Sequence, residues 1–381
     1  MAWLTVNFAW LTMQFEHVVS FLVLLTVLVF VHELGHYLVA RWNGVRVEIF
    51  SIGFGPELFG WNDRAGTRWK FSTVPLGGYV KMYGDADPTS MPGEHLPTMT
   101  AAQQAVSFHH KRLGQRAAVV AAGPIANFIL AVVILTGIIA IRGEQFLPPE
   151  VGQLVSGGAA EAAGVKPGDV IVSIDGDAVE SFDGIKRIVE INTGTPLDLV
   201  VKRDGQLMPI EVTPKMSTET DRLGFPHQVA LLGIRGKDGE FRFIHRDPLS
   251  AGWYALKQTW TITGTTLKGI WQMILGSRSS DDVAGPIGIF QLSGAVAQDG
   301  LLPLIYLAAM LSINLGLINL FPIPVLDGGH LLFYAAEAIR GKPLSQRVQE
   351  YGFRLGLALV LMLMVFATWK DLMRNFKSWS S

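Results

Sequence analysis

Long apolar runs dominate the pattern of this sequence. Residues 18–40 and 117–141 are almost entirely apolar, and two further apolar runs cover residues 303–321 and 355–369. A run of about 20 apolar residues can cross a bilayer as a helix, and the bilayer can adapt to a somewhat shorter one. The pattern therefore predicts a multi-pass α-helical membrane protein with about four spans.

Between these runs the pattern changes to that of strands and turns. Residues 45–82 combine β-branched and aromatic residues with repeated Gly and Pro, which predicts a β-hairpin region. Residues 151–214 predict a strand, a short helix (159–163), a strand (170–174), a helix (181–191) and two strands joined at Asp204-Gly205, a strong hairpin signal. The sequence therefore predicts a mixed domain inserted between the second and third spans.

An amphipathic helix is predicted to follow this domain. Asp247 can cap its N-terminus, and Pro248 suits its first turn. With its Trp-rich apolar face, we expect this helix to lie in the outer membrane interface. The apolar residues recur at helical spacing, at Leu249, Trp253, Leu256, Trp260, Leu267, Ile270, Trp271 and Ile274.

The distribution of charge predicts the orientation of the spans. No Lys or Arg precedes Arg41, whereas nine occur from Arg41 to Arg116. Basic residues favour the cytoplasmic side, so the first connection should be cytoplasmic, with the N-terminus and the inserted domain outside. Basic residues in the outer C-terminal tail weaken this contrast. Residues 1–20 lack the basic region and cleavage site of a removed signal peptide.

Composition excludes several classes of protein. Of the 381 residues, 49% are hydrophobic and only 17% are charged, which is too apolar for an ordinary soluble enzyme. The net charge of -1 argues against a nucleic-acid partner and leaves membrane lipid and apolar segments as the expected ones. Because the chain has no Cys, any metal must be held by His and carboxylate side chains.

Three polar residues in the first span carry the candidate chemistry. His32 and His36 are four residues apart, so a helix places both imidazoles on one face, where they can share a zinc ion. Glu33 lies beside them as a base for the water that zinc activates. Alternatively, the two histidines only hydrogen-bond neighbouring helices. Ionisable groups in a span are costly, however, and a metal explains all three together.

A hydrolytic zinc site needs a third protein ligand, and Asp327 is the best candidate. It lies in residues 319–330, where Pro and Gly interrupt the helix, and an interrupted helix at membrane depth is tolerated where it lines protein or a cavity. If the first and third spans run in the same direction, Asp327 lies at the level of His32 and His36. Alternatively, Asp327 is a helix cap or a loop aspartate. We interpret His330 as structural, and expect His109 and His110 to be solvated.

Three motifs together resemble the site-2 protease family over nearly the whole chain. They are residues 32–36 (HELGH), residues 123–128 (GPIANF) and the Pro-rich stretch that ends in Asp-Gly-Gly at residues 327–329. Within the family, the sigma-E-regulating proteases of proteobacteria are the more similar group, through residues 77–82, 165–169 and 285–287. The stretch at 165–169 resembles a PDZ domain. That group carries two PDZ domains in tandem, whereas the insert here has room for one.

The resemblance implies an intramembrane zinc (Zn²⁺) endopeptidase of the bacterial inner membrane, with a periplasmic PDZ domain and its active site toward the cytoplasm. Such an enzyme would perform regulated intramembrane proteolysis on single-span proteins of the anti-sigma-factor type after another protease has cut them, and leftover signal peptides would be further substrates. Residues 77–82 would form a membrane-reentrant β-loop that offers an edge to the substrate. The implied ligands are His32, His36 and Asp327, the implied base is Glu33, and the implied substrate contacts are Gly77, Gly78, Tyr79, Val80, Asn127, Asn314, Asn319, Pro322 and Pro324.

These inferences divide the chain into segments. They are the first transmembrane segment (1–44), the cytoplasmic or reentrant β-rich region (45–116), the second transmembrane segment (117–141), the PDZ domain (145–236), the interfacial helix with a connector (247–300), the third transmembrane segment with the third ligand (301–330), and the fourth transmembrane segment with the tail (331–381).

Two other classes of function remain as alternatives. A catalytically silent membrane adaptor could use its PDZ domain to bind peptide C-termini, but it would not need an intact HExxH motif. A metal transporter could use intramembrane His and Asp, but no inverted repeat is present, and transport does not need a general base.

Overall fold

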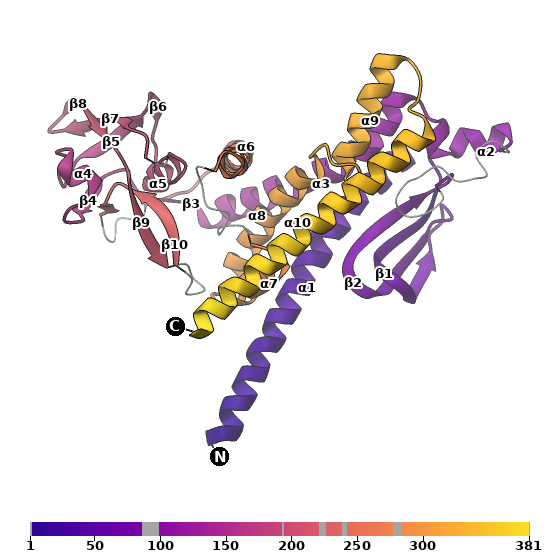
Figure 1. The fold of residues 1–381 in the computed structure, drawn as a ribbon, viewed down its shortest axis with the longest axis horizontal. Coiled ribbons are helices and arrows are strands. Elements are labelled where there is room, and N and C mark those ends of the chain that lie inside the picture. Colours follow the sequence, from indigo (N-terminus) through magenta and orange to yellow (C-terminus); the bar gives the residue numbers. More distant parts are fainter. Residues whose placement is uncertain are drawn as a thin grey trace. The chain divides into compact units, whose positions relative to one another are not determined.

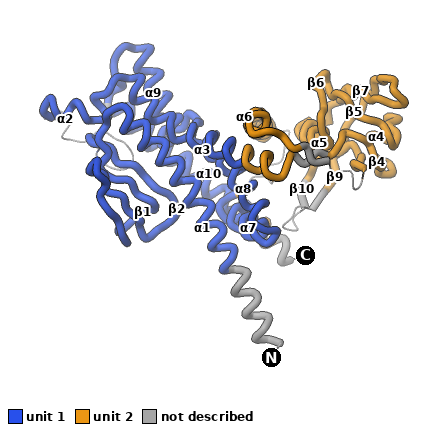
Figure 2. Tube along the Cα trace, turned by 180° about the vertical axis from the view of Figure 1, so that it is seen from behind, with its two compact units in different colours: residues 1–134, 285–372 blue, residues 135–284, 373–381 orange. Residues whose placement is uncertain are grey.

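The structure is a computed structural model that describes residues 2–85, 99–192, 194–220, 226–237, 242–276 and 284–380. Residues 277–283 of the predicted connector and residues 86–98 of the predicted β-rich region lie outside the described residues. The chain forms two compact units, one of residues 1–134 and 285–372 and the other of residues 135–284 and 373–381 (Figure 2). Each unit is described by itself.

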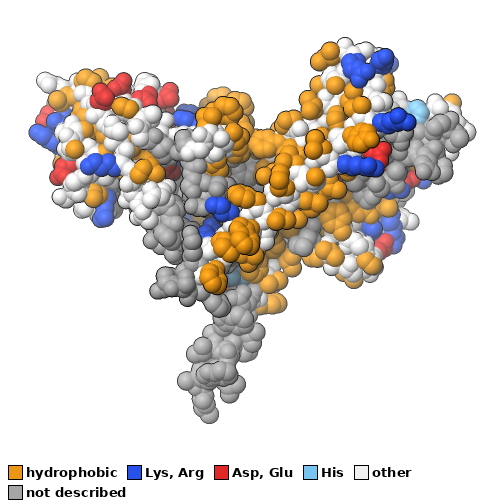
Figure 3. Space-filling model, in the orientation of Figure 1, with side chains coloured by type: hydrophobic (Ala, Val, Ile, Leu, Met, Phe, Trp, Pro, Cys, Tyr) orange, Lys and Arg blue, Asp and Glu red, His pale blue; other side chains and the backbone are white. Residues whose placement is uncertain are grey.

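Four described helices are long and apolar enough to cross a membrane. They are α1 (Ala2–Trp42), α3 (Leu113–Arg142), α8 (Leu301–Asn319) and α10 (Gln346–Ser380) (Figure 1). The four predicted spans are confirmed as helices, but the last had been predicted too short. Arg347 and Arg354, which precede the apolar run predicted at residues 355–369, belong to α10. Hydrophobic side chains cover the face of α10 that is visible in Figure 3, as lipid contact requires.

Two shorter helices of the first unit had not been predicted. α7 (Pro286–Gln298) lies in the segment interpreted as a connector, and α9 (Asp327–Arg340) begins at the predicted third ligand and crosses the boundary predicted after residue 330. The third span, predicted for the apolar run at residues 303–321, is the helix Leu301–Asn319. α7 packs against α1 and α8. At the N-terminus of α7, the backbone N–H groups of Gly285 and Gly288 donate hydrogen bonds to the buried Asp371 carboxylate of α10.

The predicted β-hairpin region contains two long strands, β1 (Val47–Asn62) and β2 (Arg68–Met82). Next to the turn, residues 57–62 pair with residues 68–72. Residues 49–52 of β1 pair with residues 68–71 on one side and with residues 78–81 on the other, and Val47 pairs with Met82. Within the described residues, the segment 78–82 is paired on one side only, so it forms an edge of this sheet.

The sheet is fixed to the helices in two ways. Its buried half packs against α1 and α3 through a hydrophobic cluster that includes Phe50 and Val80. At its turn, Asp63 accepts hydrogen bonds from the Tyr37 hydroxyl of α1 (2.8 Å) and from Trp69 Nε1 (3.0 Å). Burial opposes ionisation of Asp63, but these bonds and those from the backbone of Thr67 and Ala65 lower its pKa to about 2.

The second unit contains the segment for which a PDZ domain is predicted, and the predicted order of strands and helices is present there. A four-stranded sheet has the order β6-β5-β7-β8, and β11 pairs with β4. The Asp204-Gly205 turn joins β7 and β8 as predicted. The elements are β4 (Val151–Leu154), α4 (Ala159–Ala162), β5 (Val170–Ile174), β6 (Asp177–Ala178), α5 (Phe182–Glu190), β7 (Leu197–Arg203), β8 (Gln206–Val212) and β11 (Ile234–Gly236).

Two more strand pairs and one long helix complete this unit. β3 (Glu144–Phe146) pairs with β12 (Arg242–Ile244), and β9 (Lys215–Thr220) pairs with β10 (Pro226–Leu231). Helix α6 (Pro248–Ile274) begins where predicted, because the Asp247 carboxylate accepts the N–H groups of its first turn. α6 buries small residues such as Ala251 and Ala255 and exposes its tryptophans, with Trp260 80% exposed.

Candidate active site

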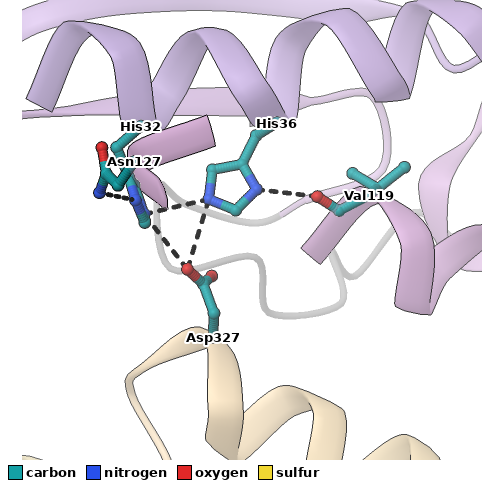
Figure 4. A network of polar contacts seen from close by, with 5 residues as sticks. All are labelled: His32, His36, Val119, Asn127 and Asp327. Atoms are coloured by element: carbon teal, nitrogen blue, oxygen red, sulfur yellow. Dashed lines mark hydrogen bonds and ion pairs between the residues drawn. The ribbon is translucent and has the colours of Figure 1, made fainter. Parts of the chain in front are cut away.

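Three side chains from two helices converge in the first unit. His32 and His36 project from one face of α1 toward Asp327, the first residue of α9 (Figure 4). The Asp327 Oδ2 atom lies 3.2 Å from His32 Nε2 and 3.5 Å from His36 Nε2. The two Nε2 atoms are 3.3 Å apart. The structure therefore brings together the three residues that were predicted to bind a metal.

The triangle of these three atoms fits a zinc ion. Tetrahedral zinc with bonds of about 2.0–2.1 Å keeps its ligand atoms about 3.3 Å apart, which matches all three separations. Asp327 Oδ2 is buried and has no hydrogen-bond partner among the described residues, although both imidazoles are within ion-pair distance of it. The donor set of two imidazoles and one carboxylate is also one that catalytic zinc sites use.

Helix α3 supports both imidazoles from behind. His36 Nδ1 donates a hydrogen bond to the Val119 carbonyl oxygen at 2.9 Å. His32 Nδ1 lies 3.0 Å from the amide nitrogen of Asn127, whose side chain is fully buried. The family resemblance implied a substrate contact for Asn127, and the structure places its amide against His32.

Two glycines allow α1 and α3 to approach closely. A Cβ atom on Gly35 would lie 2.3 Å from the Ala122 carbonyl oxygen of α3. One on Gly123 would lie 2.2 Å from His36 Nε2 and 2.9 Å from His32 Cε1. Real Cβ atoms do not approach other atoms so closely. The glycines of residues 32–36 and 123–128 are thus explained by the packing of the site.

The segment before α9 holds Asp327 in place by tight packing. Cβ atoms on Gly328 and Gly329 would collide with backbone atoms of residues 320–324. Val325 has a φ of 122°, which is rare for a β-branched residue and is a strained conformation. The same segment also lies close to α10, because a Cβ on Gly356 of α10 would overlap the Pro324 carbonyl oxygen. Pro324 therefore packs against α10.

Glu33 lies between α1 and the edge of the sheet. Its carboxylate accepts a hydrogen bond from the Val80 backbone N–H, and a Cβ on Gly78 would lie 3.3 Å from Glu33 Cγ. The Val80 side chain itself is buried in the core. Tyr79 stacks on Phe54, with ring centroids 6.1 Å apart, and Gly77, with a φ of 133°, lies against the same ring. Gly78 and Val80 thus reach the site through their backbone.

The remaining predicted contacts are more scattered. Asn314 in α8 has a buried side-chain oxygen without a hydrogen-bond partner in the described part of the chain. Asn319 is the last residue of α8 and is half-buried, whereas Pro322 is exposed. His330, interpreted as structural, is half-buried in the first turn of α9.

Two polar pairs near the site had not been predicted. His109, expected to be solvated, is mostly buried and bonds through Nε2 to Asp85 Oδ1 at 2.9 Å. Burial raises the pKa of Asp85, although this bond opposes the effect. Arg116 of α3 pairs with Glu337 of α9 at 2.5 Å, which ties the helix that carries Asp327 to the helix behind the imidazoles. Neither pair could be predicted from the sequence, because the paired residues are far apart along the chain and meet only when the helices pack.

Comparison with known proteins identifies the class of the chain. Residues 20–363 match the model of peptidase family M50. The chain belongs to peptidase family M50. This is the site-2 protease family, so the resemblance of the three motifs is confirmed.

Relatives of this M50 chain are similar over almost their whole length. A Rhizobium meliloti protein named "Putative zinc metalloprotease" is 46% identical over 356 residues, which cover 93% of this chain and 95% of the relative. "Metalloprotease MmpA" of Caulobacter vibrioides is 41% identical over 379 residues, with the same two shares. A solved PDZ domain of an SdrC-like protein from Listeria monocytogenes is 21% identical and covers 25% of this chain and 93% of its own, with a TM-score of 0.19, too low to support an argument.

The family and these names establish that this M50 chain is a zinc metalloprotease. They oppose the alternatives of a silent adaptor and of a metal transporter. Its four long apolar helices are consistent with a membrane-embedded protease.

Proposed function

We propose that this M50 protease is an intramembrane endopeptidase that performs regulated intramembrane proteolysis on single-span membrane proteins. The observation that carries the proposal is the position of the predicted metal ligands. His32 and His36 lie in an apolar helix long enough to span a bilayer, and the Asp327 carboxylate lies within ion-pair distance of both imidazoles. A peptide bond cleaved there would lie within the membrane. His32, His36 and Asp327 would hold the zinc.

The division of chemical roles follows from the residues. When bound, zinc supplies Lewis-acid activation of water and of the scissile carbonyl group. Glu33 accepts the proton of the attacking water and delivers it to the leaving amine nitrogen. The Val80 N–H orients the Glu33 carboxylate. The close packing of α1 against α3 excludes bulk water from the far side of the imidazoles.

The edge at residues 78–82 suits a substrate that must be unwound. A helical segment hides its peptide groups in internal hydrogen bonds, and these groups must find new partners in the membrane when the helix opens. Addition of the opened segment as a strand to a sheet edge supplies such partners. The edge lies next to Glu33, and the unpaired Asn314 oxygen offers one more acceptor for a substrate N–H.

The membrane placement follows from charge and from exposed apolar surface. The basic residues between the first two spans favour the cytoplasm for that connection, which puts the active site toward the cytoplasmic side of a bacterial inner membrane and the PDZ domain in the periplasm. The exposed tryptophans of α6 suit the outer interface, and the exposed Leu58, Phe59 and Trp61 of β1 suit insertion of the hairpin from the inner side.

The substrate class comes from the resemblance to sigma-E-regulating proteases. Substrates would be anti-sigma factors or similar single-span proteins whose outer domain another protease has removed. The PDZ domain then lies on the opposite side of the membrane from the zinc. It would act by excluding bulky untrimmed substrates, or by capturing newly made C-termini near Leu232, Gly233 and Ile234.

The Glu33→Gln variant tests the mechanism. We expect it to bind zinc like the wild type and to lose at least about 100-fold in cleavage rate, because an amide keeps the size of the side chain but cannot accept the proton. Zinc content of the purified protein and cleavage of a model span in detergent provide the two readouts. Glu16→Gln on the same helix is the matched control and should cleave normally. Turnover at the wild-type rate by Glu33→Gln would refute the assigned base.

A further inference from the structure

One face of α3 carries three successive supports for the histidine pair. Val119, Gly123 and Asn127 are spaced four residues apart, so they lie in a row along one side of the helix. The Val119 carbonyl oxygen contacts Nδ1 of His36, and the Asn127 amide contacts Nδ1 of His32. Gly123, between them, leaves the space that the two rings occupy. The row therefore matches the spacing of His32 and His36 on α1.

The two imidazoles face the same chemical requirement. The Nε2 atom of each lies in the metal triangle, so it must be unprotonated to bind zinc, and the proton of the neutral ring must be on Nδ1. Each Nδ1 therefore needs a hydrogen-bond acceptor. For His36 that acceptor is the Val119 carbonyl oxygen, which can only accept.

Asn127 is the group in the equivalent position for His32. Its amide nitrogen lies 3.0 Å from His32 Nδ1, while its Oδ1 is buried and has no hydrogen-bond partner among the described residues. A half-turn of the amide about its last bond exchanges the two atoms and breaks no other hydrogen bond of Oδ1. After this exchange, Oδ1 accepts the Nδ1–H of His32.

We propose that Asn127 is a positioning residue that accepts the Nδ1 proton of His32 and thereby holds the Nε2 atom bare toward the metal. This inference rests on the proposed zinc ligands. It replaces a role for Asn127 in contact with substrate or oxyanion, because the amide is fully buried behind the imidazole. The backbone is also held at this point, since the Ser312 hydroxyl of α8 donates to the Asn127 carbonyl oxygen at 2.8 Å.

The test measures metal binding by full-length protein in detergent, separately from activity. Zinc affinity is determined by competition with a chromophoric chelator, and Co²⁺ is added to apoprotein to record its visible absorption spectrum. Asn127→Leu removes the acceptor at similar volume, whereas Asn127→Asp keeps an acceptor. Asn314→Leu, in the neighbouring span, is the matched control, and Asp327→Ala is the reference for loss of a ligand.

We expect Asn127→Leu to bind zinc about 10- to 100-fold more weakly than the wild type and to shift the Co²⁺ spectrum. Asn127→Asp and Asn314→Leu should both keep wild-type zinc affinity, and Asn127→Asp should keep the Co²⁺ spectrum. Wild-type zinc affinity in Asn127→Leu together with lost cleavage would overturn the inference in favour of a substrate contact. If Asn127→Leu does not fold, Asn127→Asp decides, and weakened zinc binding in it overturns the inference. Failure of the wild type to bind one zinc, or unchanged zinc in Asp327→Ala, would instead refute the proposed site.

Discussion

At the scale of single residues, shape matters at this site as much as chemistry. In the proposed mechanism, His32, Glu33, His36 and Asp327 supply the reactive or metal-binding groups, and the sequence pointed to them because such groups are costly in a span. Gly123 supplies only the absence of a side chain. Its function became visible once α3 was found to pack against both imidazoles.

Gly123→Ala tests this requirement. The new methyl group would lie 2.2 Å from His36 Nε2, so either the imidazoles or α3 must move. Overpacking of this kind costs about 1–3 kcal/mol, and here we expect it to appear as weaker zinc binding and a lower unfolding temperature. Gly114→Ala in the same helix is the control, because nothing lies within 4 Å of its Cβ position. Equal zinc affinity in the two variants would contradict the packing argument.

At the scale of elements, the hairpin is the part whose position decides what the site can do. Its edge lies beside Glu33 only while the sheet stays packed against α1. The Asp63 carboxylate helps to hold it there by accepting hydrogen bonds from Tyr37 of α1 and from Trp69 of β2. The other contact is the buried cluster around Phe50 and Val80.

The pH dependence of stability should reveal the Asp63 contact. The pKa of Asp63 is lowered from 3.8 to about 2, so its contribution is fully present above about pH 4 and is lost as the pH falls toward 2. After discounting for partial exposure to solvent, we expect this contribution to be about 1 kcal/mol. Thermal unfolding in detergent between pH 5 and pH 2 should show it. Asp63→Asn should be less stable at pH 5 and lose less stability on acidification. Parallel curves for both proteins would argue against the contact.

Elements with a strong local signal were predicted from the sequence, and elements defined by packing were not. The spans, the helix that begins after Asp247 and the turn at Asp204-Gly205 each have a local cause in apolar length, capping or turn chemistry. α7 and α9 are too short to be recognised as spans, and their identity depends on contacts with distant helices. The role of Asn127 and the pairs His109–Asp85 and Arg116–Glu337 depend on the same long-range packing.

At the scale of the whole molecule, the proposed account combines a membrane-embedded protease with one PDZ domain. The proposed topology places the domain outside and the zinc toward the cytoplasm, so the domain cannot take part in the chemistry. We favour exclusion of bulky substrates as its role, and capture of new C-termini is the alternative.

Deletion of residues 151–235 separates these two roles. Val151 pairs with Gly236, so the chain ends left by the deletion are already neighbours. If the domain excludes bulky substrates, the deletion variant should cleave an untrimmed substrate that the intact enzyme rejects, and should still cleave a trimmed one. Gel analysis of both substrates with both enzymes measures this. Loss of cleavage of the trimmed substrate, with the bulky one still uncut, would favour capture.

The central claim is that this zinc metalloprotease cuts within the membrane, and the position of the cut tests it most directly. Wild-type protein and Glu33→Gln are reconstituted in lipid vesicles with a single-span substrate that lacks its outer domain, and the products are mapped by mass spectrometry. We predict a cut inside the apolar segment of the substrate with the wild type and none with Glu33→Gln. Cleavage confined to residues outside that segment would contradict the account.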